Sequence, residues 1–232
     1  MTQAGVVARL AVRELWISFR LFGVIAAFVA AGAIVALLPA PLPATVGRLA
    51  LGLGAATLVT ATVAASAIAA ERQAGRAGWL VSRSVTRASL LVGWFAGLAA
   101  LSLGGLAAAG LLGWLAATSV TLRLEAAGFV TLLAAVAAST LAAVGLGLLA
   151  GVLLPRRAAI LVTLAVCLGL GALAWLAPIE PTLVPGGAYA ALAALTEPGD
   201  SSAPGLRSTG IGLASAALLL VAARAAMEHA EL

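Results

Sequence analysis

The chain has 232 residues, of which 63% are hydrophobic and 9% are charged, whereas a soluble domain has about 25% charged residues. The net charge is +5, but all 13 basic residues are arginines spread between apolar runs, and no basic patch with interleaved aromatic residues predicts binding to nucleic acid. The mean hydropathy of +1.17 and the absence of a polar block of domain size predict an integral membrane protein without a separate soluble domain.

Residues 1–20 are expected to form an amphipathic helix that lies on the membrane surface. At 100° per residue, Arg9, Arg13 and Arg20 fall within an arc of about 40°. Trp16 suits the headgroup region, and the three arginines would meet the anionic phosphates of membrane lipid. The alternative is an ordinary basic flank that only orients the first span.

Six apolar segments in residues 21–232 are long enough to cross a bilayer. A helix needs roughly 20 apolar residues to cross the hydrocarbon layer, where unpaired backbone groups are not tolerated. The predicted spans are residues 21–38, 49–70, 89–117, 127–154, 158–178 and 209–227. The expected fold is therefore all-α, a single six-helix transmembrane domain that follows the interfacial helix.

The distribution of arginines between the spans predicts the orientation. Three of the 13 arginines, Arg48, Arg123 and Arg207, fall on one side, and the other ten fall on the opposite side. Because short basic loops resist translocation, both termini are expected in the cytoplasm. The absence of lysine and the heavy use of Ala, Gly, Leu and Arg resemble the coding bias of a high-GC bacterium, so we expect a multi-pass protein of a bacterial inner (plasma) membrane.

Two groups of small or hydroxylated residues occur inside the spans. Hydroxyls follow the second span at Thr57, Thr60, Thr62 and Ser66, where they could line a pathway or bond to carbonyls of the preceding turn. Glycines in the third and fourth spans predict close approach of helix backbones. These glycines are Gly104, Gly105, Gly113, Gly145, Gly147 and Gly151.

The longest polar segment on the predicted cytoplasmic side is residues 71–88, ERQAGRAGWLVSRSVTRA. If it formed one helix, its four arginines would share an arc of about 60°. Gly75 and Gly78 favour a break, so two short pieces are equally compatible with the sequence. The segment is either a docking element for a cytoplasmic partner or a basic loop that obeys the positive-inside rule. The four arginines are Arg72, Arg76, Arg83 and Arg87.

At this segment the sequence resembles the membrane subunits of type-two ABC exporters. The matching residues are Glu71, Gly75, Leu80, Val81, Val85, Arg87, Leu90, Leu91 and Gly93. The chain departs from the family pattern at Gly78, Ser84 and Trp94, where a second acidic residue, a proline and a lysine are common. The six-span topology, which covers nearly the whole chain, agrees with the resemblance.

Two further segments are similar to that family. A short basic turn, Pro155–Arg157, follows the fourth span. Residues 179–208 suit a re-entrant or surface-lying piece on the outer side, because the apolar stretch 188–195 is too short to span. These likenesses extend the resemblance towards the end of the chain.

The resemblance implies a permease subunit of an exporter, paired with a second permease chain as a homo- or heterodimer and powered by two cytoplasmic ABC ATP-binding subunits. It implies that spans one, two and five line the pathway. A non-transporting membrane subunit that anchors or assembles a partner complex is the alternative, and a haem-export permease is a third possibility. The candidates for docking to the ATPase are Glu71, Arg72, Gly75, Arg76, Arg83 and Arg87.

The residues that the chain lacks argue against chemistry of its own. A P-loop needs a lysine to reach the β- and γ-phosphates, and the chain has no lysine. ATP and Mg²⁺ are therefore expected in the partner ATPase, and no cofactor or catalytic residue is expected here. With one histidine, His229, and one cysteine, Cys167, no metal site is predicted. The centres of the predicted spans hold no ionisable residue that could couple transport to an ion gradient.

Overall fold

A computed structural model describes residues 2–38, 42–82, 85–119, 126–176 and 202–229. Every secondary-structure element in these residues is a helix, and six of the helices are long and apolar enough to cross a membrane. The predicted all-α fold with six spans is confirmed. The helices are α1 (Gln3–Ile17), α2 (Arg20–Leu37), α3 (Leu42–Gln73), α4 (Arg76–Ser82), α5 (Arg87–Ser119), α6 (Ala126–Leu153), α7 (Arg156–Leu176) and α9 (Ser202–His229).

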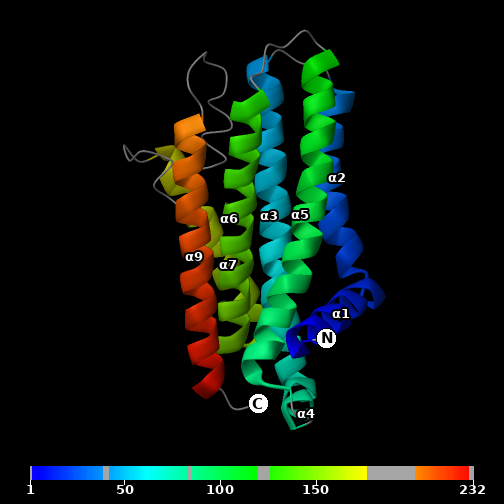
Figure 1. Cartoon of the computed structure of the whole chain (residues 1–232), viewed down its shortest axis with the longest axis vertical. Coiled ribbons are helices and arrows are strands. Elements are labelled where there is room, and N and C mark those ends of the chain that lie inside the picture. Colours follow the sequence, from blue (N-terminus) through cyan, green and yellow to red (C-terminus); the bar gives the residue numbers. More distant parts are fainter. Residues whose placement is uncertain (1, 39–41, 83–84, 120–125, 177–201, 230–232) are drawn as a thin grey trace.

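The six long helices run side by side in one bundle, and the two short helices α1 and α4 lie at the same end of it (Figure 1). We call this the α4 end. The last turn of α9 lies there as well. The first helix and the C-terminal turn of the last helix in the described chain are therefore at one end, as an even number of spans requires. Arg48 and Arg207 belong to the first turns of α3 and α9 at the opposite end.

The span boundaries follow the predicted ones closely, with two extensions. Helix α3 begins at Leu42, earlier than the predicted residue 49, and α9 begins at Ser202 instead of residue 209. Residues 202–208 of the predicted surface piece are therefore the first turns of a span, and residues 179–201 lie outside the described residues. Arg83 and Arg123 also lie outside them.

The bundle has α6 at its centre, in contact with α3, α7 and α9, while α2 packs against α3 and α5. Backbones approach closely at two of the six glycines predicted to allow it. A Cβ on Gly147 would overlap the carbonyl oxygen of Ala61, and one on Gly151 would lie 2.6 Å from that of Ala65. The atoms nearest to Gly105, Gly113 and Gly145 belong to side chains, and no atom lies within 4 Å of the Cβ position of Gly104.

Helix α1 is shorter than predicted and lies across the end of the bundle (Figure 1). It ends at Ile17, and Phe19 takes a left-handed conformation with φ 58° before α2 begins at Arg20. Val7, Ala11 and Leu15 form its buried face, which packs on α5. The expectation that Arg20 shares one helical face with the arginines of α1 is therefore wrong, because the chain turns between them.

Candidate functional site

The α4 end is the first candidate site, and a glycine turn creates its shape. Gly75 has φ +68°, a conformation that residues with a Cβ rarely adopt. Its N–H donates to the carbonyl of Arg72 at 3.0 Å, so α3 ends and α4 leaves in a new direction. The break therefore falls at Gly75, whereas Gly78 lies inside α4. On α4, the side chain of Trp79 is 58% exposed.

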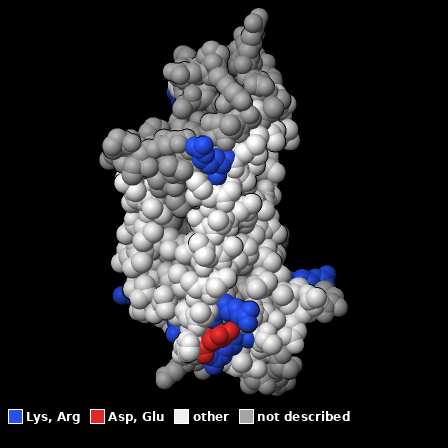
Figure 2. Space-filling view, turned by 60° about the vertical axis from the view of Figure 1, so that its left-hand side comes forward, with Lys and Arg blue, Asp and Glu red and all other residues white. Residues whose placement is uncertain are grey.

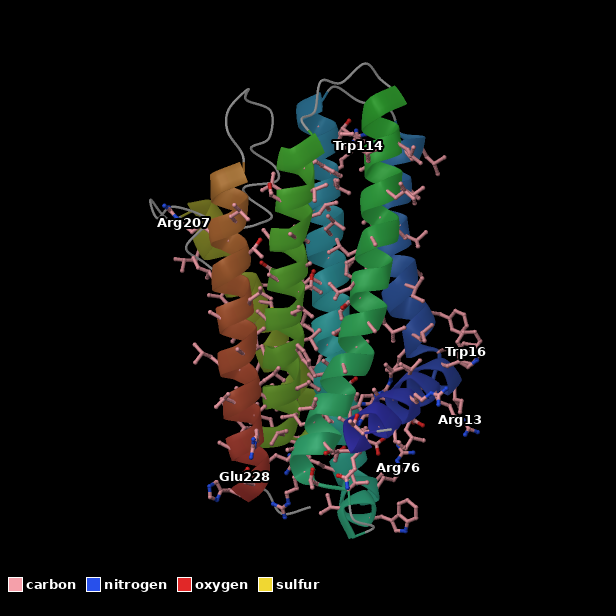
Figure 3. All side chains as sticks on the ribbon, viewed as in Figure 1. Arg13, Trp16, Arg76, Trp114, Arg207 and Glu228 are labelled. Atoms are coloured by element: carbon pink, nitrogen blue, oxygen red, sulfur yellow. The ribbon has the colours of Figure 1, made fainter. Side chains whose placement is uncertain are left out.

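Arg76 joins three helices by ion pairs. Its Nη2 atom lies 3.0 Å from Glu71 Oε1 of α3 and 3.5 Å from Glu14 Oε1 of α1. The side chain of Glu71 is 9% exposed, while that of Arg76 is 53% exposed, so Arg76 covers a carboxylate that would otherwise be a buried charge with less compensation. Figure 3 shows Arg76 beside α1. We call Glu14, Glu71 and Arg76 the ion-pair network.

Two of the arginines expected to dock a partner bind helix ends of this chain instead. Arg72 Nη1 donates to the carbonyl of Gly151 at 3.3 Å and to that of Val152. Arg87 Nη1 donates to the carbonyls of Met227 and Glu228 at 2.9 and 2.7 Å. The last carbonyls of a helix have no partner within it and attract positive charge. Both arginines therefore satisfy helix C-termini, those of α6 and α9.

The docking candidates consequently do not share one face. Arg72 belongs to α3, Arg76 to α4 and Arg87 to α5. The single helix that would have placed four arginines within one arc is not formed in the described residues, because Gly75 interrupts it. Among the described arginines of residues 71–88, Arg76 is the one that lies on α4, and Glu71 packs against it.

The interfacial candidates lie on α1 and at the start of α2. Arg9, Arg13 and Trp16 are exposed on α1, and Arg20 is half-buried at the start of α2. The ring of Trp16 lies 4.8 Å from that of Phe22, centroid to centroid, and Phe19 lies 5.9 Å from Phe22. This aromatic cluster was not predicted, although the spacing of aromatic residues around Arg20 could have indicated it.

The second candidate site is a cleft within the membrane-spanning part of the bundle. It lies between α3, α6, α7 and α9, has a volume of about 600 Å³, and is lined almost entirely by apolar side chains. Its few polar groups are Thr57, Ser139, Cys167 and Ser215. A cleft of this composition suits an apolar occupant with a small number of hydrogen-bonding groups.

The four hydroxyls predicted to line a pathway differ in their hydrogen-bond partners. Thr57 lines the cleft, and its Oγ1 lies 3.0 Å from Oγ1 of Thr140 on α6. The other three donate to carbonyls of the preceding turn, which is their ordinary role in an apolar helix. These bonds are Thr60 to Ala56 at 2.9 Å, Thr62 to Val59 at 2.8 Å and Ser66 to Val63 at 3.0 Å.

The fold and these sites define a multi-pass membrane protein. In the described parts of the chain, no three residues of the types His, Cys, Asp and Glu gather as metal ligands would. A scan against models of protein families finds no match for the chain, and a search of characterised proteins finds none either. Function must therefore be argued from the two sites and from the resemblance of residues 71–93.

Proposed function

We propose that the chain is the transmembrane subunit of an ABC transporter, in the type-two exporter class, and that a separate cytoplasmic subunit supplies ATP hydrolysis. The observation that carries the proposal is α4. A short helix between the second and third spans lies at the extreme end of the molecule (Figure 1). It lies within the segment Glu71–Gly93 that resembles that class, in which a cytoplasmic element between the second and third spans couples the permease to the ATPase.

The construction of α4 supports a docking role. Gly75 directs the helix away from α3, and the ion-pair network fastens it to α3 and α1. Trp79 is 58% exposed, which is a large aromatic surface outside the bundle, and aromatic residues are favoured at the centres of protein interfaces. A force applied to α4 by a partner would therefore reach two other helices.

Pairing with a second permease chain is part of the proposal. Only 11% of the residues of the α7 span, Arg156–Leu173, are buried. Leu161 and Leu168 are 66% and 56% exposed, so this helix offers the bundle's most open apolar surface. Helix α7 also supplies one wall of the cleft, so a second chain packed against α7 would lie next to the cleft.

The experiment is affinity purification of the tagged chain from the membranes of its own host, followed by ATPase assay and peptide sequencing of what remains bound. We expect a polypeptide with a Gly-x-x-x-x-Gly-Lys-Ser/Thr loop and vanadate-sensitive ATP hydrolysis. Trp79→Ala should reduce the recovered ATPase several-fold. Trp16→Ala is the matched control, because Trp16 is 56% exposed at the same end of the bundle but belongs to α1.

Arg76→Glu is a poorer test than Trp79→Ala, because Arg76 holds Glu14 and Glu71 and its reversal would disturb α1 and α3 as well. Equal recovery of the ATPase with Trp79→Ala would remove α4 as the docking site. Recovery of a stable complex without an ATP-binding subunit would contradict the transporter and favour the anchoring subunit.

A further inference from the structure

We propose that a groove between α1 and α5 binds one anionic glycerophospholipid of the surrounding bilayer. The groove has a volume of about 450 Å³. Its rim includes Arg9, Arg13 and Trp16 of α1, and its floor includes Ala96, Gly97 and Ala100 of α5. We call it the α1–α5 groove. The proposal does not depend on whether the chain belongs to an ABC transporter.

Small residues on α5 create the hollow. A Cβ on Gly97 would lie 3.2 Å from the carbonyl oxygen of Ala8, so the glycine lets α1 settle closely on α5. Ala96 and Ala100 flank it and are exposed, because their methyl groups do not fill the space beneath the longer side chains of α1. The result is an apolar trough on the exposed side of α5, whose other sides pack on α2, α3 and α6.

The rim of the groove differs in chemistry from its floor. Arg9 and Arg13 are four residues apart on α1, so their exposed side chains lie on one face. No described residue that lines the groove is acidic, and Glu14, the next carboxylate along α1, is paired with Arg76. Figure 3 shows Arg13 and Trp16 together on the outer side of α1. The described rim therefore carries two positive side chains and no carboxylate, which suits an anionic group.

The position in the bilayer selects a lipid rather than a soluble anion. The rings of Trp16 and Phe22 contact each other in a tilted arrangement at the turn between α1 and α2, and such aromatic residues favour the headgroup level of a bilayer. Ala96, Gly97 and Ala100 belong to Arg87–Leu115, a helix long and apolar enough to cross a membrane, so the floor suits an acyl chain. A molecule with a phosphate at the rim and an acyl chain along the floor matches both parts, and guanidinium groups bind phosphate in a forked geometry.

The test is native mass spectrometry of the purified chain titrated with phosphatidylglycerol or with phosphatidylcholine. We expect one tightly bound phosphatidylglycerol. Arg9→Ala with Arg13→Ala should weaken its binding about thirtyfold, because each basic residue near an anionic lipid contributes roughly fivefold. Arg156→Ala with Arg157→Ala is the matched control, since it removes two exposed arginines at the start of α7, outside the groove.

A second variant separates the acyl chain from the headgroup. Ala100→Leu fills the floor and keeps both arginines, and it should weaken phosphatidylglycerol binding, whereas Ala107→Leu, at an exposed position two turns along α5, should not. Equal loss of lipid with the control arginine pair would overturn the proposal, as would an Ala100→Leu chain that binds the lipid normally. Glycerol phosphate that binds as tightly as the lipid would also overturn it, in favour of a soluble phosphate. Lipid binding is compared only among variants whose thermal midpoints are the same.

Discussion

Gly147 sets the distance between α3 and α6. A Cβ there would overlap the carbonyl oxygen of Ala61 and lie 3.0 Å from Cβ of Ala64, and a backbone oxygen cannot move aside as a side chain can. Gly147→Ala should lower the free energy of unfolding by about 1–3 kcal/mol, although alanine favours a helix by up to about 1 kcal/mol. Thermal unfolding in detergent measures it.

Gly104 provides the comparison for that variant. Its Cβ position has no neighbour within 4 Å, so Gly104→Ala should leave the thermal midpoint unchanged or raise it. If both alanine variants unfolded at the wild-type temperature, the close packing of α3 on α6 would not limit stability.

Arg72 is expected to stabilise the chain without any partner. Its guanidinium donates to the carbonyls of Gly151 and Val152, and hydrogen bonds to charged groups contribute about 1.5–3 kcal/mol. Arg72→Ala should therefore lower the thermal midpoint of the isolated chain, and Arg72→Lys should recover part of the loss. Arg156→Ala, at an exposed arginine of α7, should have no such effect.

The thermal midpoint, measured together with recovery of the ATPase, decides between two roles of Arg72. An Arg72→Ala chain that keeps its full stability but loses the ATPase would return Arg72 to the docking surface. A loss of stability together with normal ATPase binding would confine it to the end of α6.

At the scale of whole helices, the sequence predicts the spans well because the bilayer fixes both their length and their apolar character. It indicates a break at Gly75 or Gly78 without choosing between one helix and two, and the structure places the break at Gly75, which has a positive φ. It could not predict the partners of Arg72 and Arg87, because those carbonyls are 79 and 140 positions away in the chain. The cleft could not be predicted for the same reason, because four helices from different parts of the sequence line it.

The turn before α2 shows how a local pattern can mislead. Periodicity placed Arg20 on the face of α1, yet periodicity holds only while the helix continues. Helix α1 ends at Ile17, and Phe19 has φ 58° before α2 begins. Phenylalanine is an uncommon residue at positive φ, so no sequence signal of the usual kind, a glycine or an asparagine, marked the turn.

The ion-pair network is expected to hold α1 and α4 as one unit. Arg76→Ala removes the contacts to Glu14 and Glu71 and leaves the buried carboxylate of Glu71 with less compensation. Because the side chain of Arg76 is 53% exposed, solvent screens both pairs, and each contributes at most about 1 kcal/mol. The expected result is faster amide hydrogen exchange in α1 and α4, by about two- to fivefold, with the spans unaffected.

Arg224→Ala is the control for that experiment. It removes the ion pair with Glu228 at 3.1 Å, which lies within α9 and joins no other helix. Exchange in α1 and α4 should then remain as in the wild type. Equal acceleration in both variants would mean that loss of charge, and not the link between helices, governs the local opening.

For the molecule as a whole, the arginines at the two ends of the bundle predict the orientation. Among the described arginines, Arg48 and Arg207 lie opposite the α4 end, and Figure 2 shows basic side chains gathered with acidic ones at the other end. Because basic flanks stay in the cytoplasm, α4 should face the cytoplasm, where a soluble ATPase could reach it.

Labelling of single cysteines tests this orientation. In a Cys167→Ser background, Arg157→Cys at the α4 end and Arg207→Cys at the opposite end are both at exposed positions. A membrane-impermeant maleimide added to intact spheroplasts should label Arg207→Cys alone, and permeabilised spheroplasts should give both. The reverse pattern would place α4 outside the cell, away from ATP. That result would end the proposed transporter but leave the α1–α5 groove intact, because phosphate headgroups line both surfaces of a bilayer.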